Sequence, residues 1–179
     1  MDAVGYSEMI AIRAKTAADQ AWVEETLARL WGGCIVAVHG DAFEAAALPA
    51  LIAGEREGLL TYRLDAPIAE IVTLNALRPG RGIGTALVEA LAADLSPYGI
   101  REIRVTTTND NLDALRFYQR RGFRLAGLRP GAVAAARRLK PAIPAKGNFG
   151  IPRSDWNSCA TWLPNRDRLK PRSFPSRCR

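Results

Sequence analysis

Apolar positions along this chain alternate between a strand-like period of two and a helix-like spacing of three and four residues, from the N-terminus onward. Segments in which apolar residues alternate with polar ones, or run unbroken for a few positions, predict strands. These strands are expected at Glu8–Ala14, Cys34–Val38, Ala47–Ala53, Gly58–Leu64, Ile68–Leu77, Ile100–Thr108 and Phe123–Leu128. Apolar residues spaced three and four apart predict helices over Ala18–Trp31, from Ile83 to Leu95, and from Asn111 to Arg121. Strands that alternate with helices in this way predict a domain of the α/β class.

A glycine-rich segment joins one predicted strand to the next helix. It reads Gly80-Arg81-Gly82-Ile83-Gly84-Thr85. Glycines let the backbone approach an anion closely, and a helix N-terminus adds free N–H donors and a partial positive charge that suit a pyrophosphate. The segment lacks the Gly-Lys-Ser/Thr ending of a P-loop, and Leu87 stands where a dinucleotide-binding loop needs its third glycine. Taken alone, it predicts either a phosphate-binding loop or a tight turn.

Two motifs in this order resemble those of the GNAT superfamily of N-acetyltransferases. The first is the run from Arg81 to Leu87 after a strand. The second is Asn111-x-x-Ala114-x-x-x-Tyr118-x-x-x-Gly122-Phe123, separated from the first by a helix and a strand. The resemblance is strongest over Ile68–Leu128. It implies a mixed, strongly twisted central sheet with flanking helices, splayed between two central strands to form a V-shaped cleft for acetyl-CoA.

The resemblance also assigns roles to individual residues. Backbone amides of the phosphate loop would bind the pyrophosphate, and these belong to Arg81, Gly82, Ile83, Gly84 and Thr85. Backbone late in the preceding strand would bind the pantetheine arm and the thioester carbonyl, at Leu74, Asn75 and Ala76. Asn111 matches a side chain that contacts the coenzyme, and Tyr118 matches the general acid that protonates the departing thiolate. Pro79 departs from the family pattern, which often has Arg or Gln there, and it removes one backbone donor.

Glu70 is the candidate general base. In an ideal strand its carboxylate shares one face with Ile68, Val72 and Leu74, and such apolar neighbours would raise its pKa toward a range useful for accepting a proton. The run that starts at Ala69 also resembles the base-bearing strand of the histone-acetylating branch of the superfamily. A salt-bridged or solvated strand glutamate is the alternative, and a β-bulge would rotate the faces.

Structural alternatives exist for the other two side chains as well. Tyr118 follows Phe117, so its ring could fill the core. Asn111 could cap the helix that it precedes, either instead of or together with contacting the coenzyme. The neighbouring arginines at positions 116, 120, 121 and 124 are expected to form a solvated helix face, and contact with the 3′-phosphate of the coenzyme is the alternative.

Composition narrows the function classes further. The chain has 179 residues, a net charge of +7 and a pI near 9.8, which by itself is compatible with nucleic-acid binding. However, residues 1–152 carry 18 basic and 16 acidic side chains, so most of the excess charge lies in residues 153–179 and disfavours that partner for the domain. Three cysteines without a CxxC pair and a single histidine predict no metal site and a reducing cytoplasm. No long apolar run or signal peptide is recognised, so we expect no membrane association.

The composition changes abruptly after Pro152. Residues 153–179 contain no Gly, Val, Ile or Glu and show no sustained period. We therefore expect an acetyltransferase domain over residues 1–152, followed by a basic tail with little structure. A further hypothesis is that the tail is out-of-frame translation of what was the final strand, because the codons for Asp155-Trp156-Asn157 read Leu-Glu in a shifted frame. This would leave a sheet edge unpaired.

The sequence thus predicts an N-acetyltransferase that moves an acetyl group from acetyl-CoA directly to an amine. A catalytically silent acyl-CoA-binding regulatory module would carry the same binding motifs, and only turnover separates the two. The amine could be a small molecule or a protein amine, and its identity is left open, as is assembly into a homodimer.

Overall fold

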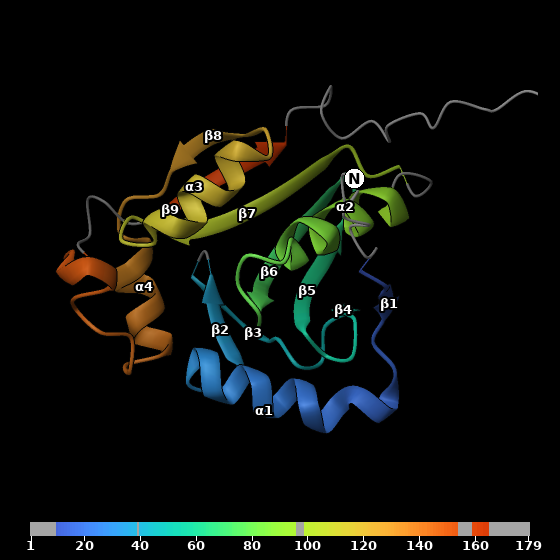
Figure 1. Cartoon of the computed structure of the whole chain (residues 1–179). Helices are drawn as coiled ribbons and strands as arrows, with labels where there is room; N and C mark the ends of the chain where they lie inside the picture. The colour runs from blue at the N-terminus through green and yellow to red at the C-terminus, as the bar shows by residue number, and fades with distance from the viewer. Residues whose placement is uncertain (1–9, 39, 96–98, 154–158, 165–179) are drawn as a thin grey trace, which may run out of the picture.

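The structure is a computed structural model that describes residues 10–38, 40–95 and 99–153, together with the backbone of 159–164. Its strands are β1 (Ile12–Ala14), β2 (Ile35–Val38), β3 (Asp41–Glu44), β4 (Ala50–Ala53), β5 (Gly58–Asp65), β6 (Ile68–Ala76), β7 (Glu102–Thr108), β8 (Phe123–Leu128) and β9 (Cys159–Pro164). Its helices are α1 (Gln20–Trp31), α2 (Ile83–Leu95), α3 (Leu112–Arg120) and α4 (Ala132–Leu139), with short 3-10 helices at Ala17–Asp19 and Asn148–Gly150. The elements confirm the predicted α/β class (Figure 1).

A seven-stranded mixed sheet forms the centre of the molecule, in the order β1-β4-β5-β6-β7-β9-β8. Its neighbouring strands are antiparallel except for the parallel pair β6 and β7. The predicted strand at Cys34–Val38 does not join this sheet, because β2 pairs only with β3 in a separate hairpin. Strand β3 was not predicted, since its four residues carry a charge at each end and show no apolar period.

Alternation along the strands sends apolar side chains to two cores. In β4 and β5, Leu51 and Leu60 face the cluster beneath α2 and α3, whereas Ile52 and Leu59 face the cluster beneath α1 and β2. Both faces of the central strands are therefore buried, as their nearly unbroken apolar runs require. Figure 1 shows α1 at the bottom of the view, away from α2 and α3.

The two central strands diverge toward their carboxyl ends. Pairing between β6 and β7 ends at Ile71 and Val105, although the strands continue to Ala76 and Thr108. In Figure 1, β7 runs away from β6 beyond this point. This divergence is the splay that the resemblance implied.

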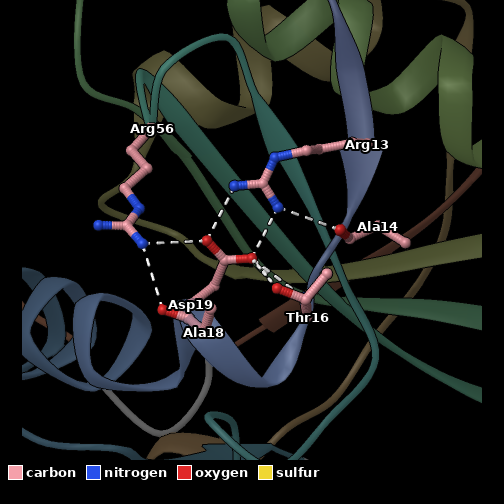
Figure 2. A network of polar contacts seen from close by, with 6 residues as sticks. All are labelled: Arg13, Ala14, Thr16, Ala18, Asp19 and Arg56. Carbon is pink, nitrogen blue, oxygen red and sulfur yellow. Dashed lines mark hydrogen bonds and ion pairs between the residues drawn. The ribbon is translucent and has the colours of Figure 1, made fainter.

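The start of α1 is tied to the sheet by a buried carboxylate, shown in Figure 2. Asp19 accepts hydrogen bonds from both terminal nitrogens of Arg13, at 2.6 and 2.8 Å, and one from Arg56 at 3.2 Å. Thr16 donates to it through its backbone and its hydroxyl. These hydrogen bonds, that of Arg13 above all, hold the pKa of Asp19 far below its usual range. The network joins β1, α1 and the turn between β4 and β5.

Helix α4 was not predicted from the sequence. It begins after Gly131, whose φ of +75° suits glycine, and it packs on β2 and β3. Lys140 at its end donates to the carbonyl oxygens of Trp31, at 2.7 Å, and Ile35, at 2.9 Å. Helix α4 therefore fixes the C-terminus of α1. In the described part of the chain, no helix combines the length and apolar character needed to cross a membrane.

The expected tail contains one regular element. Strand β9 lies between β7 and β8 and pairs antiparallel with both, so the expectation of little structure is wrong for these six residues, and this position of the sheet is filled. Trp156 and the side chain of Trp162 lie outside the described residues. The domain boundary and the hypothesis of out-of-frame translation stay predictions.

Candidate active site

Glu70 lies in β6, just before the point where β6 and β7 part. Its side chain is buried and accepts a hydrogen bond from Arg63 Nε at 2.8 Å and a longer one, at 3.3 Å, from the Thr106 hydroxyl. The Arg63 guanidinium also lies over the ring of Phe43, 4.8 Å from its centroid. The Glu70 carboxylate therefore has a charged and a polar partner. The sequence analysis predicted apolar surroundings for it and gave a salt bridge as the alternative.

A β-bulge rotates the faces of β6 beyond Glu70. Tyr62 pairs with Ile71 but Thr61 pairs with Thr73, so Val72 is an extra residue. As a result Val72 packs in the cluster beneath α1, while Leu74 packs against the opposite cluster. The prediction that Leu74 shares a face with Glu70 is therefore wrong. Thr73 takes that place, and its hydroxyl is hydrogen-bonded to that of Thr61 at 2.8 Å.

Tyr118 is buried where α3 meets the sheet. Its ring packs edge-on against Phe117, with centroids 5.1 Å apart, and tilted against Phe123 at 5.2 Å. Burial raises the pKa of the Tyr118 phenol above its usual value, and only the charge of Arg121 opposes this. The side chain is therefore a protonated hydroxyl at neutral pH, as a general acid must be, and it is also part of the core.

The phosphate loop leads into α2 as the glycine pattern predicted. Gly80 and Gly82 both have a φ of +79°, and the Gly82 carbonyl accepts the first helical hydrogen bond, from the Ala86 amide, at 3.0 Å. No acidic residue lies in the first turn of α2, so no carboxylate of that turn competes for its free N–H groups. This helix start is suited to bind an anion.

Arg121 brings a positive charge to the same turn. Its Nε donates to the Thr85 hydroxyl at 2.8 Å, and its guanidinium stacks on Phe117, 3.6 Å from the ring centroid. The expectation that Arg121 only belongs to a solvated face is therefore wrong. Gly84 faces Phe117 as well, because a Cβ built on it would lie 3.0 Å from that ring. Gly84 thus permits close packing of α2 on α3.

Asn111 caps α3, with its Oδ1 accepting from the Ala114 amide at 3.2 Å. This is the structural role that the sequence offered for it, and the capping geometry leaves the side-chain NH₂ group for other contacts. Asp110, the preceding residue, is fully buried. Burial alone would raise the pKa of Asp110, but hydrogen bonds from Arg153, Thr108 and the Asn148 amide hold it below its usual range.

The Arg153 and Asp110 side chains form an ion pair that was not predicted from the sequence. The guanidinium donates to both carboxylate oxygens, at 2.9 and 3.0 Å, and the Asn148 amide donates to Oδ2 at 2.8 Å. This pair holds the loop that contains Phe149, which is exposed and has a φ of +57°. The sequence signal for this contact was Gly147, because a Cβ at that position would clash with the Asp110 carboxylate. The loop lies next to the carboxyl end of β7.

Asn75 lies near the carboxyl end of β6, and no role was predicted for its side chain from the sequence. Only its backbone was given a role, but its side chain is 9% exposed and its Oδ1 accepts from Trp31 Nε1 at 2.9 Å. Leu74 and Ala76 flank it on the part of β6 that no longer pairs with β7. This is where the resemblance placed the pantetheine arm.

An open, shallow pocket of about 560 Å³ lies elsewhere, between α1 and the β2–β3 hairpin. It is lined by Cys34, by Glu24, Glu25 and Glu44, and by two alanines of α1. Burial, with Glu44 and Glu24 nearby, raises the pKa of the Cys34 thiol, which therefore behaves as a small apolar side chain. Within the described ranges, no group of His, Cys, Asp and Glu side chains is placed to hold a metal ion.

Comparison with known proteins gives the same family as the motifs. The acetyltransferase (GNAT) family model matches residues 58–123. The uncharacterized protein YdhI of Bacillus subtilis (strain 168) is 38% identical over 128 residues, which cover 69% of this chain and 80% of that protein. Among solved structures, the IAA acetyltransferase from Bacillus cereus ATCC 14579 is similar with a TM-score of 0.63 at 17% identity, over 87% of this chain and 98% of that one. A GNAT family acetyltransferase from Elizabethkingia anophelis with acetyl-CoA bound has a TM-score of 0.58 at 16% identity, over 87% and 97%.

Proposed function

We propose that this chain, which belongs to the GNAT family of acetyltransferases, transfers the acetyl group of acetyl-CoA directly to the nitrogen of an amine. One observation carries the proposal: β6 and β7 part next to a helix start with free N–H groups and no acidic residue. A pyrophosphate at α2 and an extended arm along the unpaired edge of β6 would fit this arrangement. The acetyl-CoA bound to the structural neighbour from Elizabethkingia anophelis supports the same co-substrate here.

Two side chains of this chain would move protons. Glu70 would accept the proton that the amine loses when its nitrogen attacks the acetyl carbon, directly or through water. Tyr118 would give its proton to the sulfur of coenzyme A as the C–S bond breaks. Glu70 lies before the divergence of the strands, and Tyr118 lies on the helix that follows β7. Both roles are proposals that rest on the motifs and on this placement.

The ion pair of Glu70 with Arg63 makes the role of Glu70 testable. We expect Glu70→Gln to lower turnover about 100-fold or more and to leave acetyl-CoA affinity nearly unchanged, most severely below the pKa of the amine. The matched control is Arg63→Gln, which also breaks the pair but keeps the base. It should retain most of the turnover. Equal losses of turnover in both variants would show that only the pair's structural role matters.

A catalytically silent acyl-CoA-binding regulatory module is the second candidate. It is favoured by the fact that both candidate catalytic side chains have structural partners, Glu70 in an ion pair and Tyr118 in an aromatic cluster. Incubation with saturating acetyl-CoA and a panel of amines separates the two functions. The enzyme forms N-acetylated product and free coenzyme A in equal amounts, whereas the silent module forms neither.

The acceptor, the assembly and the compartment stay predictions. We expect an amine of small-molecule or protein origin, no metal, no nucleic-acid or membrane partner, and a cytoplasmic location. A homodimer is compatible with the sequence, and sedimentation of the purified chain would test it.

A further inference from the structure

The side chain of Asn75 holds a buried hydrogen-bond donor that has no partner in the part of the chain that the structure describes. Its oxygen is used by Trp31, but its nitrogen Nδ2 is buried and unpaired. The indole N–H of Trp31 can only donate, so the amide oxygen must face it and the NH₂ group must face away. A buried donor without a partner costs free energy, and native proteins keep few of them. This one is therefore expected to serve a ligand.

The position of Asn75 identifies the ligand atom that it can reach. Asn75 follows Glu70 on β6 and shares a face with Glu70 and Thr73, as the pairing beyond the bulge shows. It precedes the phosphate loop, and its strand no longer pairs with β7. An acetyl-CoA whose phosphates bind at the start of α2 and whose acetyl group approaches Glu70 must pass Asn75. Near that end of the coenzyme, the atom that most needs a donor is the thioester oxygen.

We propose that Asn75 Nδ2 donates a hydrogen bond to the thioester oxygen of bound acetyl-CoA. The proposal rests on the proposed function and gives the Asn75 side chain a catalytic role, while Trp31 is a positioning residue that fixes the amide. When the amine forms its bond to the acetyl carbon, the carbonyl electron pair moves onto this oxygen. It returns when the C–S bond breaks and the sulfur takes a proton. A fixed donor stabilises the oxygen while it carries negative charge.

The test compares acetyl-CoA with coenzyme A, which lacks the thioester oxygen, so no acceptor amine is needed. The measured quantity is the dissociation constant of each, by calorimetry, and the ratio of the two constants. We expect Asn75→Leu to weaken acetyl-CoA relative to coenzyme A by about fivefold or more, which is the loss of one hydrogen bond. Affinity for coenzyme A itself should stay within about twofold. Asn75→Asp keeps the shape and removes the donor, and it should shift the ratio in the same direction.

Two further variants separate this role from a structural one. The double variant Thr61→Val/Thr73→Val removes polar groups from the same face, but those groups satisfy each other, so the ratio should not change. Trp31→Phe removes the group that fixes the amide, so it should shift the ratio less than Asn75→Leu does. Asn75→Leu removes the unpaired donor, which favours stability, and also the hydrogen bond from Trp31 Nε1, which lowers stability, so the melting temperature of the unliganded protein should change little.

The outcomes are distinct. If the native chain binds neither coenzyme, the proposed function itself fails. If it binds both and the ratio is unchanged in Asn75→Leu and Asn75→Asp, the inference about Asn75 is overturned and the proposed function stands. A lower melting temperature with an unchanged ratio would assign Asn75 to structure alone. Should Asn75→Leu not fold, Asn75→Asp decides.

Discussion

Replacement of Tyr118 by Phe removes a single oxygen and keeps the ring that packs between Phe117 and Phe123. Because the volume of the buried side chain hardly changes, the free energy of unfolding should change by less than about 1.5 kcal/mol. Tyr118→Ala, in contrast, would leave a cavity in the cluster and cost about 3–5 kcal/mol, so it could not separate catalysis from folding. The Phe variant is therefore the informative one.

Loss of a general acid lowers turnover by about 100-fold to 10,000-fold, which corresponds to about 2.7–5.4 kcal/mol in the activation barrier. The pKa of Tyr118 is raised by burial, so the native side chain keeps its proton up to and above its ordinary pKa of 10.0. The preference of the folded state for the protonated phenol is fully present below that pH and is lost as the pH rises through the folded pKa. Any decline of turnover from Tyr118 ionisation should thus lie above about pH 10.

Release of free thiol from acetyl-CoA, followed at saturating amine from pH 6 to 9, measures this effect. Tyr118→Phe should lose turnover by a constant factor across that range, with acetyl-CoA affinity and melting temperature close to those of the native chain. Turnover within about threefold of native would contradict the assignment. Tyr118 would then be a core residue, and water or the substrate would have to supply the proton.

Three other predictions follow from buried or close contacts. Asp19→Asn should lower stability at pH 7 and flatten its dependence on pH, because hydrogen bonds, first that of Arg13, depress the pKa of the native carboxyl. The stabilisation by the native carboxylate is present above the unfolded pKa near 3.8 and is lost as the pH falls from there toward the folded pKa. If the free energy of unfolding in urea changed equally between pH 3 and 7 in the variant and in the native chain, this prediction would be contradicted. Gly84→Val should cost about 1–3 kcal/mol by overpacking α2 against α3, and an unchanged melting temperature would refute the close packing. Arg153→Met should leave the Asp110 carboxylate buried without its cation and lower the free energy of unfolding by about 3–5 kcal/mol, measured in urea. A loss below about 1 kcal/mol, the value typical of an exposed ion pair, would contradict this.

Local patterns were enough to predict the elements nearest the site. The apolar spacing from Ile83 to Leu95 predicted a helix that ends before Pro97, and α2 spans Ile83–Leu95. The glycines before it adopt the positive φ values that a glycine loop allows. Such features depend on neighbours in the sequence. The family motifs then identified the fold, which the divergence of β6 and β7 confirms.

Side-chain environments depended on distant partners and could not be predicted in the same way. The bulge at Val72 arises from the pairing of β5 with β6. Because of it, Thr73 shares a face of β6 with Glu70, where Leu74 was predicted. The donor that orients Asn75 is Trp31, which is 44 positions away. Nothing in either local segment indicates that pairing.

The composition break after Pro152 also gave only part of the arrangement. It marks a real change in sequence, but Arg153 binds Asp110 at 43 positions' distance, and β9 completes the sheet between β7 and β8. Composition records which residues are common in a segment, whereas strand pairing depends on backbone N–H and C=O groups, of which proline lacks only the N–H. A segment with an atypical composition can therefore still add a strand.

The central claim, that this chain binds acetyl-CoA at α2 and along β6, is tested most directly by thermal unfolding with and without acetyl-CoA. At 100 times its dissociation constant the ligand should stabilise the fold by about 2.7 kcal/mol. For a chain of this length, that corresponds to a rise of about 5–10 °C in melting temperature. A melting temperature that does not move at millimolar acetyl-CoA would contradict the account.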